Sequence, residues 1–295
     1  MSDSIMRVRF LILGVLLLGT AFFSFIPLML GGQEAFVLGE KGSSLLTVAF
    51  LDVGQGDAIF IETPDGVQML IDGGADSSVL RELPKYMPML DKSLDVVLAT
   101  HPDKDHIGGL VDVLERYRVE DIIWTKNKND TAVSDTFNSA VEDELATVHI
   151  ARSGQQLMLG ASTTLLILSP TGDTTNWESN TSSIVAQLRY GDIEFMLTGD
   201  APISIEEYLA QNYGEALESE VLKLGHHGSK TSTSDDFLSV VKPKYGVISA
   251  DIGNRYGHPH HEVVLRAIEY KVELSNTATD GTIVFKSDGK TVWRE

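Results

Sequence analysis

The chain has 295 residues, of which 43% are hydrophobic and 22% charged, and this balance excludes a wholly disordered or collagen-like protein. The formal net charge of −19 (23 Lys and Arg against 42 Asp and Glu) argues against a protein that coats nucleic acid through a basic face. The chain has no cysteine, which excludes disulfides, thiolate zinc sites and a cysteine nucleophile.

The N-terminal segment contains an uncharged apolar run over residues 10–32, directly after Arg7 and Arg9. A bilayer crossing takes ~20 residues, so this run is long enough to span. The residues before Gly31 form a poor signal-peptide cleavage site. We therefore predict an N-terminal transmembrane helix within residues 1–32 as a membrane anchor, with a cleaved signal segment as the alternative. The flanking arginines place the N-terminus in the cytoplasm and the rest of the chain outside it.

A Gly- and Ser-containing linker is expected at residues 33–45, followed by one domain over residues 46–295. Strands are predicted, in chain order, at 46–53, 58–62, 67–71, 94–99, 122–124, 165–168, 184–190, 193–197, 221–224, 245–249 and 283–286. Helices are predicted between them at 78–86, 109–117, 137–145, 203–213, 237–241 and 262–272. Two β-rich halves with intervening helices indicate an α+β fold, in which two sheets pack together and helices cover the outside.

The densest set of potential metal ligands follows the apolar strand expected at 94–99. His101, Asp103, Asp105 and His106 fall within six residues. Imidazole and carboxylate groups suit zinc, manganese or iron, and this spacing in a loop that leaves a strand can direct ligands at two adjacent centres. The alternative is a solvated polar loop with a helix-capping aspartate, and further clusters downstream argue against it.

Two such clusters also follow apolar strands. Asp200 comes after the strand expected at 193–197, where a carboxylate could bridge two metals or only cap a helix or turn. His226 and His227 are adjacent at the next strand end, with a glycine on each side. We expect one of them to be a ligand and the other to contact substrate or act as an acid.

The other histidines carry weaker signals. His258 precedes the last helix and could reach the site. The alternative is that it is only a surface residue. His260 and His261 are expected to be exposed residues at the helix start, and His149 is expected to be structural.

Together, these motifs resemble the metallo-β-lactamase superfamily, and more narrowly the extracytoplasmic hydrolase domain of ComEC-type DNA-uptake proteins. The runs that carry the resemblance are FLDVGQGDA (50–58), LIDGG (70–74), THPDKDHIGG (100–109), LTGD (197–200), KLGHHGS (223–229) and GHP (257–259). They occur in this order across about residues 46–290. The resemblance implies an αββα four-layer sandwich, with the metals at one edge between the two sheets.

The resemblance also implies a site with two divalent metal ions, zinc first and manganese as the alternative. The implied metal ligands are His101, Asp103, Asp105, His106, Asp200 as the bridge, and His226. The implied catalytic residues are Asp105, His227 and His258. Asp52, Asp57 and Asp72 are expected to order the loop and orient the ligands. The superfamily has histidines where this chain has Asp103 and the stretch 180–183, so we expect the first metal to be held weakly.

The implied function is a membrane-anchored, extracytoplasmic phosphodiesterase or nuclease, in which a metal-activated hydroxide attacks the phosphorus. His227 or His258 would protonate the leaving group, and Ser229 and Thr231 would hold a phosphate oxygen. DNA is one candidate substrate, and its uptake would need a separate channel protein because the sequence has a single candidate span.

Two other functions stay open. An acidic chain repels polyanions, which favours a cell-envelope esterase such as a phosphocholine esterase. A non-catalytic binding module with the same fold is the third hypothesis. A basic groove would favour the nuclease, an aromatic cage would favour a quaternary amine, and failure to bind metal would favour the module.

Overall fold

The computed structural model describes residues 35–38 and 45–295. The membrane anchor predicted at residues 1–32 lies outside the described residues, and so does most of the linker. Within the described part, no helix is both long and apolar enough to span a bilayer. Strand β1 (Ala35–Leu38) lies inside the expected linker and pairs in parallel with β8 (Gln156–Leu159), so part of that segment belongs to a sheet.

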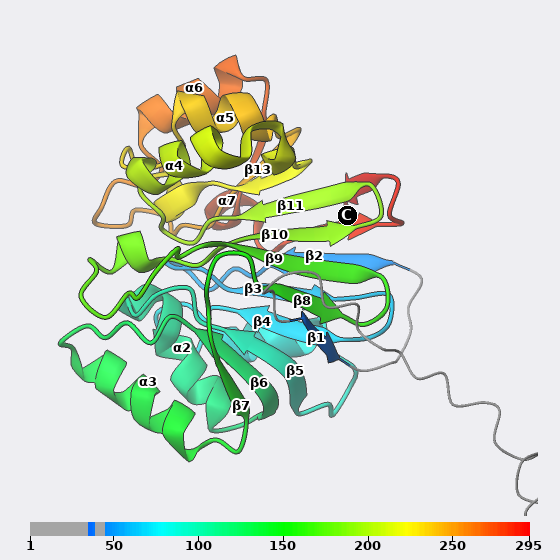
Figure 1. Ribbon diagram of the computed structural model, residues 1–295, viewed down its shortest axis with the longest axis vertical. Helices are drawn as coiled ribbons and strands as arrows, with labels where there is room; N and C mark the ends of the chain where they lie inside the picture. Colours follow the sequence, from blue (N-terminus) through cyan, green and yellow to red (C-terminus); the bar gives the residue numbers. More distant parts are fainter. Residues whose placement is uncertain (1–34, 39–44) are drawn as a thin grey trace, which may run out of the picture. The chain divides into compact units, whose positions relative to one another are not determined.

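Two eight-stranded mixed sheets form the centre of the domain (Figure 1). The first has the order β16-β15-β2-β3-β4-β5-β6-β7 and comprises β2 (Leu46–Phe50), β3 (Ile59–Glu62), β4 (Gln68–Ile71), β5 (Ser93–Leu98), β6 (Arg118–Trp124), β7 (Thr147–Ile150), β15 (Ile283–Ser287) and β16 (Val292–Arg294). The second has the order β1-β8-β9-β10-β11-β12-β13-β14 and adds β9 (Thr163–Ser169), β10 (Val185–Tyr190), β11 (Ile193–Leu197), β12 (Val221–Lys223), β13 (Tyr245–Ile248) and β14 (Glu273–Asn276).

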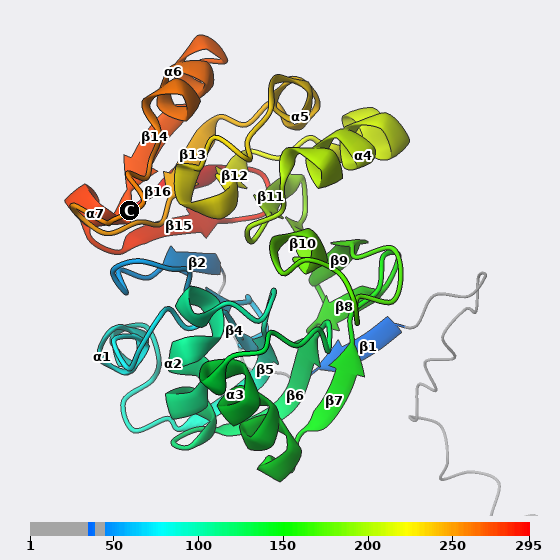
Figure 2. The ribbon, with the colours of Figure 1, turned by 90° about the vertical axis from the view of Figure 1, so that its left-hand side faces the viewer.

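Helices cover the outer face of each sheet (Figure 2). The first sheet carries α1 (Val79–Glu82), α2 (Lys104–Leu114) and α3 (Ala132–Asp143), whereas the second carries α4 (Ile203–Tyr213), α5 (Asp235–Val241) and α6 (His261–Glu269), and α7 (Thr277–Asp280) follows β14. A third apolar cluster fills the space between the sheets, where Phe285 packs edge-on against Phe50 and Phe195. The predicted α+β fold of two packed sheets with helices outside is therefore confirmed.

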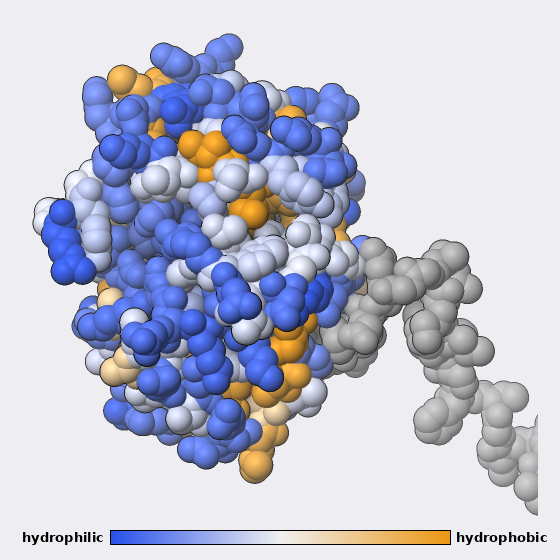
Figure 3. All heavy atoms as spheres, turned by 60° about the vertical axis from the view of Figure 1, so that its left-hand side comes forward, coloured by the Kyte–Doolittle hydropathy of each residue, from blue (hydrophilic) through white to orange (hydrophobic). Residues whose placement is uncertain are grey.

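Strand β5 shows why these strands read as continuous apolar runs. Leu94 and Val97 face the helices of the first sheet, whereas Val96 and Leu98 face the second sheet. Both faces are buried toward the end of the strand, so residues 96–98 form an unbroken apolar run. Apolar residues are instead sparse on the face of the molecule in Figure 3, where they form small, separate patches.

The main change from the predicted elements is at helix α2, which begins at Lys104 instead of residue 109. The backbone of Asp103 is extended, and its carbonyl accepts the first hydrogen bonds from His106 and Ile107. The metal-ligand motif therefore ends in a helical turn and not in a loop. A Cβ at Gly109 would lie 2.0 Å from the Gly73 carbonyl oxygen, so glycine permits the close approach of this helix to the end of β4.

Candidate metal centre

The predicted ligands meet at the carboxyl ends of parallel strands from both sheets. Strands β4 and β5 are parallel neighbours in the first sheet, and β11, β12 and β13 are parallel neighbours in the second. The residues that leave these strands therefore reach the same edge of the sandwich, which is the usual place for a site in such sheets. The first sheet supplies His101 and His106, and the second supplies Asp200 and His227.

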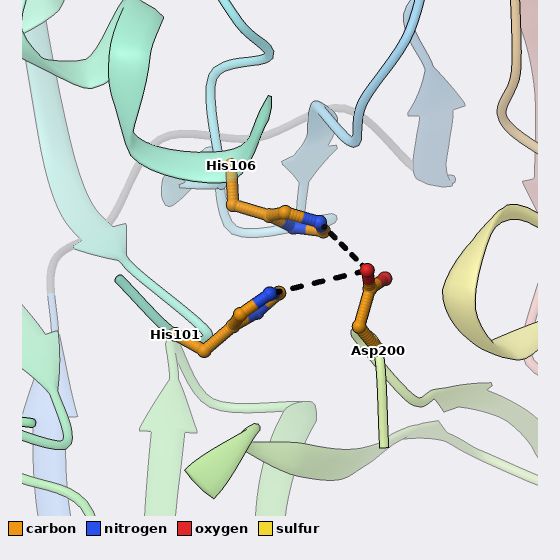
Figure 4. A group of neighbouring side chains, drawn as sticks. All are labelled: His101, His106 and Asp200. Carbon is orange, nitrogen blue, oxygen red and sulfur yellow. Dashed lines mark ion pairs between the residues drawn. The ribbon is translucent and has the colours of Figure 1, made fainter. Parts of the chain in front are cut away.

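One carboxylate oxygen is the focus of the site. Oδ2 of Asp200 lies 3.3 Å from Nε2 of His106, 3.4 Å from Nε2 of His227, 3.6 Å from Nε2 of His226 and 3.9 Å from Nε2 of His101. Figure 4 shows His101 and His106 pointing at Asp200 from the opposite side. Four imidazoles thus converge on one buried aspartate, and together these donors could hold a divalent ion.

Two further carboxylates lie on either side of this focus. Oδ2 of Asp103 is 3.7 Å from Nε2 of His101, and Oδ2 of Asp105 is 3.4 Å from Nε2 of His227. Asp103 is held by the Asn129 amide, and Ser179 donates to it at 2.7 Å. The arrangement therefore gives two adjacent ligand groups on one shared carboxylate, His101 with Asp103 and His227 with Asp105.

The polar atoms of this cluster fit a metal ion. The Nε2 atoms of His101, His106 and His227 are buried without a hydrogen-bond partner, as is Oδ1 of Asp200. A buried polar atom without a partner is unfavourable by about 1–3 kcal/mol, so a set of them in one place needs an explanation. Imidazole nitrogens and carboxylate oxygens are ligands for first-row divalent ions, which would satisfy all of them together.

The electrostatics of the cluster also favour a cation. Burial disfavours the imidazolium form of both buried histidines. Nevertheless, Asp200 and Asp72 raise the pKa of His106 well above its ordinary value. Asp200 and Asp57 do the same for the pKa of His227. Burial likewise opposes ionisation of Asp200, yet His227 and His106 hold its pKa well below its usual range. Protons thus occupy the place of positive charge, and a divalent ion would displace them.

Asp72 fixes the orientation of His106. Its carboxylate accepts hydrogen bonds from the Thr100 backbone N–H at 2.8 Å and the Thr100 hydroxyl at 2.7 Å, and it contacts Nδ1 of His106 at 2.8 Å. This contact directs Nε2 of His106 at Asp200. Such carboxylate–histidine pairs set the tautomer and basicity of metal-binding imidazoles.

Lys223 is the main part of the site that the sequence reading missed. Its side chain is completely buried, and Nζ lies 2.5 Å from Oδ2 of Asp57 and 3.4 Å from the Gly199 carbonyl. Burial opposes ionisation of Asp57, but the Lys223 ammonium, His227 and His106 together outweigh it and lower the pKa of the carboxyl to about 2. Oδ1 of Asp57 lies 3.4 Å from Nδ1 of His227. A lysine inside the apolar run 221–224 was the available signal.

The adjacent histidines take different places because both have left-handed backbone angles, with φ of 50° at His226 and 56° at His227. His227 is buried and Nδ1 contacts the Ser249 carbonyl at 2.9 Å, which leaves Nε2 for the cluster. The side chain of His226 is 25% exposed and pairs with the Thr231 hydroxyl at 3.1 Å. His227 therefore lies deep in the cluster, whereas His226, which the resemblance favours as the ligand, lies at the rim.

His258 borders the cluster without joining it. Its ring centroid lies 5.4 Å from that of His226 and 6.2 Å from that of His227. Burial and the charge on His227 lower the pKa of His258 to about 4. It is therefore neutral at pH 7 and can accept a hydrogen bond there, whereas the sequence reading considered it as an acid.

The other singled-out residues lie around the centre or away from it. His260 accepts a hydrogen bond from the Lys230 N–H, exposed His261 begins α6, and His149 pairs with Asp121 in the first sheet. The Asp52 carboxylate accepts a hydrogen bond from Gly54. The stretch 180–183 supplies the Ser183 hydroxyl, which accepts a hydrogen bond from the Asp200 N–H, and the Ser229 and Thr231 hydroxyls bond to each other.

Comparisons with known proteins agree with this geometry. Residues 51–128 match the family model of the metallo-beta-lactamase superfamily. The chain is 29% identical to ComE operon protein 3 of Bacillus subtilis, over 81% of the chain and 33% of that protein. It is 33% identical to Recombination protein 2 of Haemophilus influenzae, over 79% of the chain and 28% of that protein. The chain thus spans about a third of the length of these relatives.

A solved structure shows the same fold. The metallo-beta-lactamase fold protein YhfI from Bacillus subtilis superposes with a TM-score of 0.53 at 13% identity, over 84% of this chain and 99% of that one. The two-sheet sandwich, the matched motif region and the ligands at the sheet edge lead to one conclusion. The chain carries a domain with the metallo-β-lactamase fold, within which residues 51–128 match the superfamily model, and its homologues include ComE operon protein 3, Recombination protein 2 and Competence protein ComA.

Proposed function

We propose that the domain is a metal-dependent phosphodiesterase that acts outside the cytoplasmic membrane. The observation that carries the proposal is the convergence of four Nε2 atoms on Oδ2 of Asp200, with Asp103 and Asp105 on either side. Two divalent ions, when bound, lower the pKa of a water molecule and neutralise charge that develops on a phosphoryl group. A carboxylate-rich ligand set suits manganese as well as zinc.

The chain's own residues would do the rest of the work. Asp105 is 27% exposed and lies beside the buried cluster, where it can orient a water molecule toward the phosphorus. His226 at the rim, whose pKa burial lowers, can accept a hydrogen bond from substrate at neutral pH. Ser229 and Thr231 follow it on the same loop and offer hydroxyl donors for a phosphate oxygen.

The place of action is part of the same proposal. The apolar run at residues 10–32 would anchor the chain, with the domain on the outer side of the membrane. The curated relatives are named as competence and recombination proteins, so DNA is the first substrate to test. A separate channel protein would be the partner for DNA uptake.

The test is hydrolysis of bis(p-nitrophenyl) phosphate by the full chain after removal and return of zinc or manganese. The double variant Asp105→Ala, His106→Ala should bind less metal and lose turnover at least 100-fold. The matched control is His149→Gln, which changes a histidine that pairs with Asp121 away from the cluster. Protein that binds two metals but leaves the phosphodiester intact would refute the proposed reaction. Folded protein that binds no metal would favour a binding module.

A further inference from the structure

The two carboxylate oxygens of Asp103 have different surroundings. Oδ1 accepts a hydrogen bond from the Asn129 side-chain amide and a second one from the Ser179 hydroxyl at 2.7 Å. Oδ2 lies 3.7 Å from Nε2 of His101, which is close enough for both atoms to reach one zinc ion through bonds of about 2.0–2.2 Å. One oxygen of Asp103 is therefore bound by the protein, and the other is left for an ion.

The two donors to Asp103 come from different halves of the sandwich. Asn129 lies in the loop between β6 and α3 of the first half, whereas Ser179 lies between β9 and β10 of the second sheet. Nδ2 of Asn129 is also 3.3 Å from the Ser179 hydroxyl. Ser179 is 8% exposed, whereas the side chain of Asp103 is 33% exposed. Without the two donors, Asp103 could therefore turn its carboxylate to solvent.

Hydrogen bonds between these two loops fix the donors in place. Nδ2 of Asn127 donates to the Trp177 carbonyl at 3.2 Å and to the Ser182 hydroxyl at 2.9 Å. The Thr174 hydroxyl donates to the Thr125 carbonyl at 2.9 Å. The fold itself thus positions both donors, so little further entropy is lost when the carboxylate that they hold binds an ion.

Asp105, the second carboxylate at the rim, is held differently. Its ligand atoms form a compact group with those of His106 and His227, all within 4.8 Å of one another. No amide or hydroxyl side chain in the described part of the chain donates to Asp105. Asp103 belongs to none of the compact groups that the described residues form. Asp105 thus joins its group directly, whereas Asp103 depends on its two donors to keep Oδ2 near His101.

We propose that Asn129 and Ser179 are positioning residues that set the affinity of one ion position, the one beside His101, by holding Asp103 as a ligand with a single free oxygen. The inference rests on the proposed metal-dependent function and adds that the two ion positions are unequal. Hydrogen-bond partners of a metal ligand typically contribute about 10–100-fold to metal affinity. Only the position beside His101 receives this contribution from Asn129 and Ser179.

The test is titration of the metal-free full chain with zinc in competition with a chromogenic chelator, which gives the affinity of each position. Asn129→Ala and Ser179→Ala should each lower one affinity about 10–100-fold and leave the other unchanged. Ser179→Thr should keep both affinities, because the hydroxyl remains. Thr175→Ala is the matched control, since Thr175 lies in the same loop as Ser179 but donates to the Asp173 carboxylate at 2.6 Å.

An Asp103→Ala background shows whether the two donors act through this carboxylate. In that background, Asn129→Ala should have no further effect on either affinity. A further loss of the same size would show that Asn129 supports the site by another route, and it would overturn the inference.

The zinc titration also separates this inference from the proposed reaction. If two zinc ions bind with the expected selective loss but bis(p-nitrophenyl) phosphate stays intact, the proposed reaction fails and the role of Asn129 and Ser179 stands. Equal losses at both positions, or unchanged affinities in both alanine variants, would overturn that role even if the phosphodiester is hydrolysed. Folded wild-type protein that binds fewer than two zinc ions would overturn it as well.

Discussion

Replacement of Lys223 by methionine tests the charge balance of the centre. The lysine side chain is completely buried, and its ammonium contacts Oδ2 of Asp57 at 2.5 Å. Methionine fills a similar volume but leaves the Asp57 carboxylate without its cation in a place that is 1% exposed. We expect the variant to lose stability through this orphaned charge and not through a cavity.

The magnitude follows from the burial of the pair. Removal of one partner of a buried ion pair lowers the free energy of unfolding by about 3–5 kcal/mol. For a domain of this size each kcal/mol moves the melting temperature by about 2–4 °C, so a decrease of roughly 6–20 °C is expected. The double variant Lys223→Met, Asp57→Asn should recover most of this loss, because replacement of both partners is often close to neutral.

The assay is urea unfolding and thermal unfolding of both variants in EDTA, so that metal binding does not contribute. Lys242→Met is the matched control, since Lys242 is half exposed and pairs with Glu218 at the surface. That change should alter the stability by at most about 1 kcal/mol. The Lys223→Met loss should also be smaller at pH 5 than at pH 7.5. In this variant the lysine no longer holds Asp57 ionised, so its buried carboxyl is protonated more readily.

Two results would refute this reasoning. A loss in Lys223→Met no larger than that in Lys242→Met would show that the buried carboxylate finds another partner. A double variant as unstable as the single one would show that the effect comes from packing of the lysine stem and not from charge.

Three further predictions concern metal binding, the buried carboxylate of Glu206 and the protonation of two histidines. Asp72→Asn should weaken metal binding about 10–100-fold in chelator competition, and Asp52→Asn should not. Glu206→Gln should lower the free energy of unfolding in urea by about 1–3 kcal/mol. Each oxygen of the buried carboxylate accepts one backbone N–H bond, and glutamine replaces one of these oxygens with an NH2 group that cannot accept. In EDTA, the melting temperature should fall as pH rises above about 6.5. Folding raises the pKa of His106 and of His227, so their protonated forms stabilise the native state, and deprotonation removes this stabilisation. A flat pH profile would contradict the assigned charges.

Much of the architecture could be read from local patterns. Strands buried on both faces, such as β5, give short apolar runs with β-branched residues, and these were predicted near their observed positions. The short strands β8, β14 and β16 were missed, because they lie toward sheet edges and mix polar with apolar residues. Pairing with a neighbour defines such strands, and a single sequence does not show that pairing.

The candidate site was likewise predicted only in part. The clusters around His101, Asp200 and His226 stood out because several ligand types occur together at strand ends. The depth of His227 depends on two successive left-handed residues, and the burial of Lys223 depends on Asp57, which is distant in sequence. The first feature is a local backbone conformation that two adjacent histidines do not reveal. The second is a contact between the two sheets, and the lysine inside the apolar run 221–224 was its only sign in the sequence.

The division of the ligands between the sheets has a consequence for the order of assembly. His101 and His106 belong to one half of the sandwich, and Asp200 and His227 to the other, so a bound ion would close a loop of about a hundred residues. The four imidazoles around Asp200 come from both halves, so this set is complete only in the assembled sandwich. An ion held by that set would therefore link the two halves of the sandwich. Such an ion would lower the unfolding rate of the native state and would not raise the folding rate.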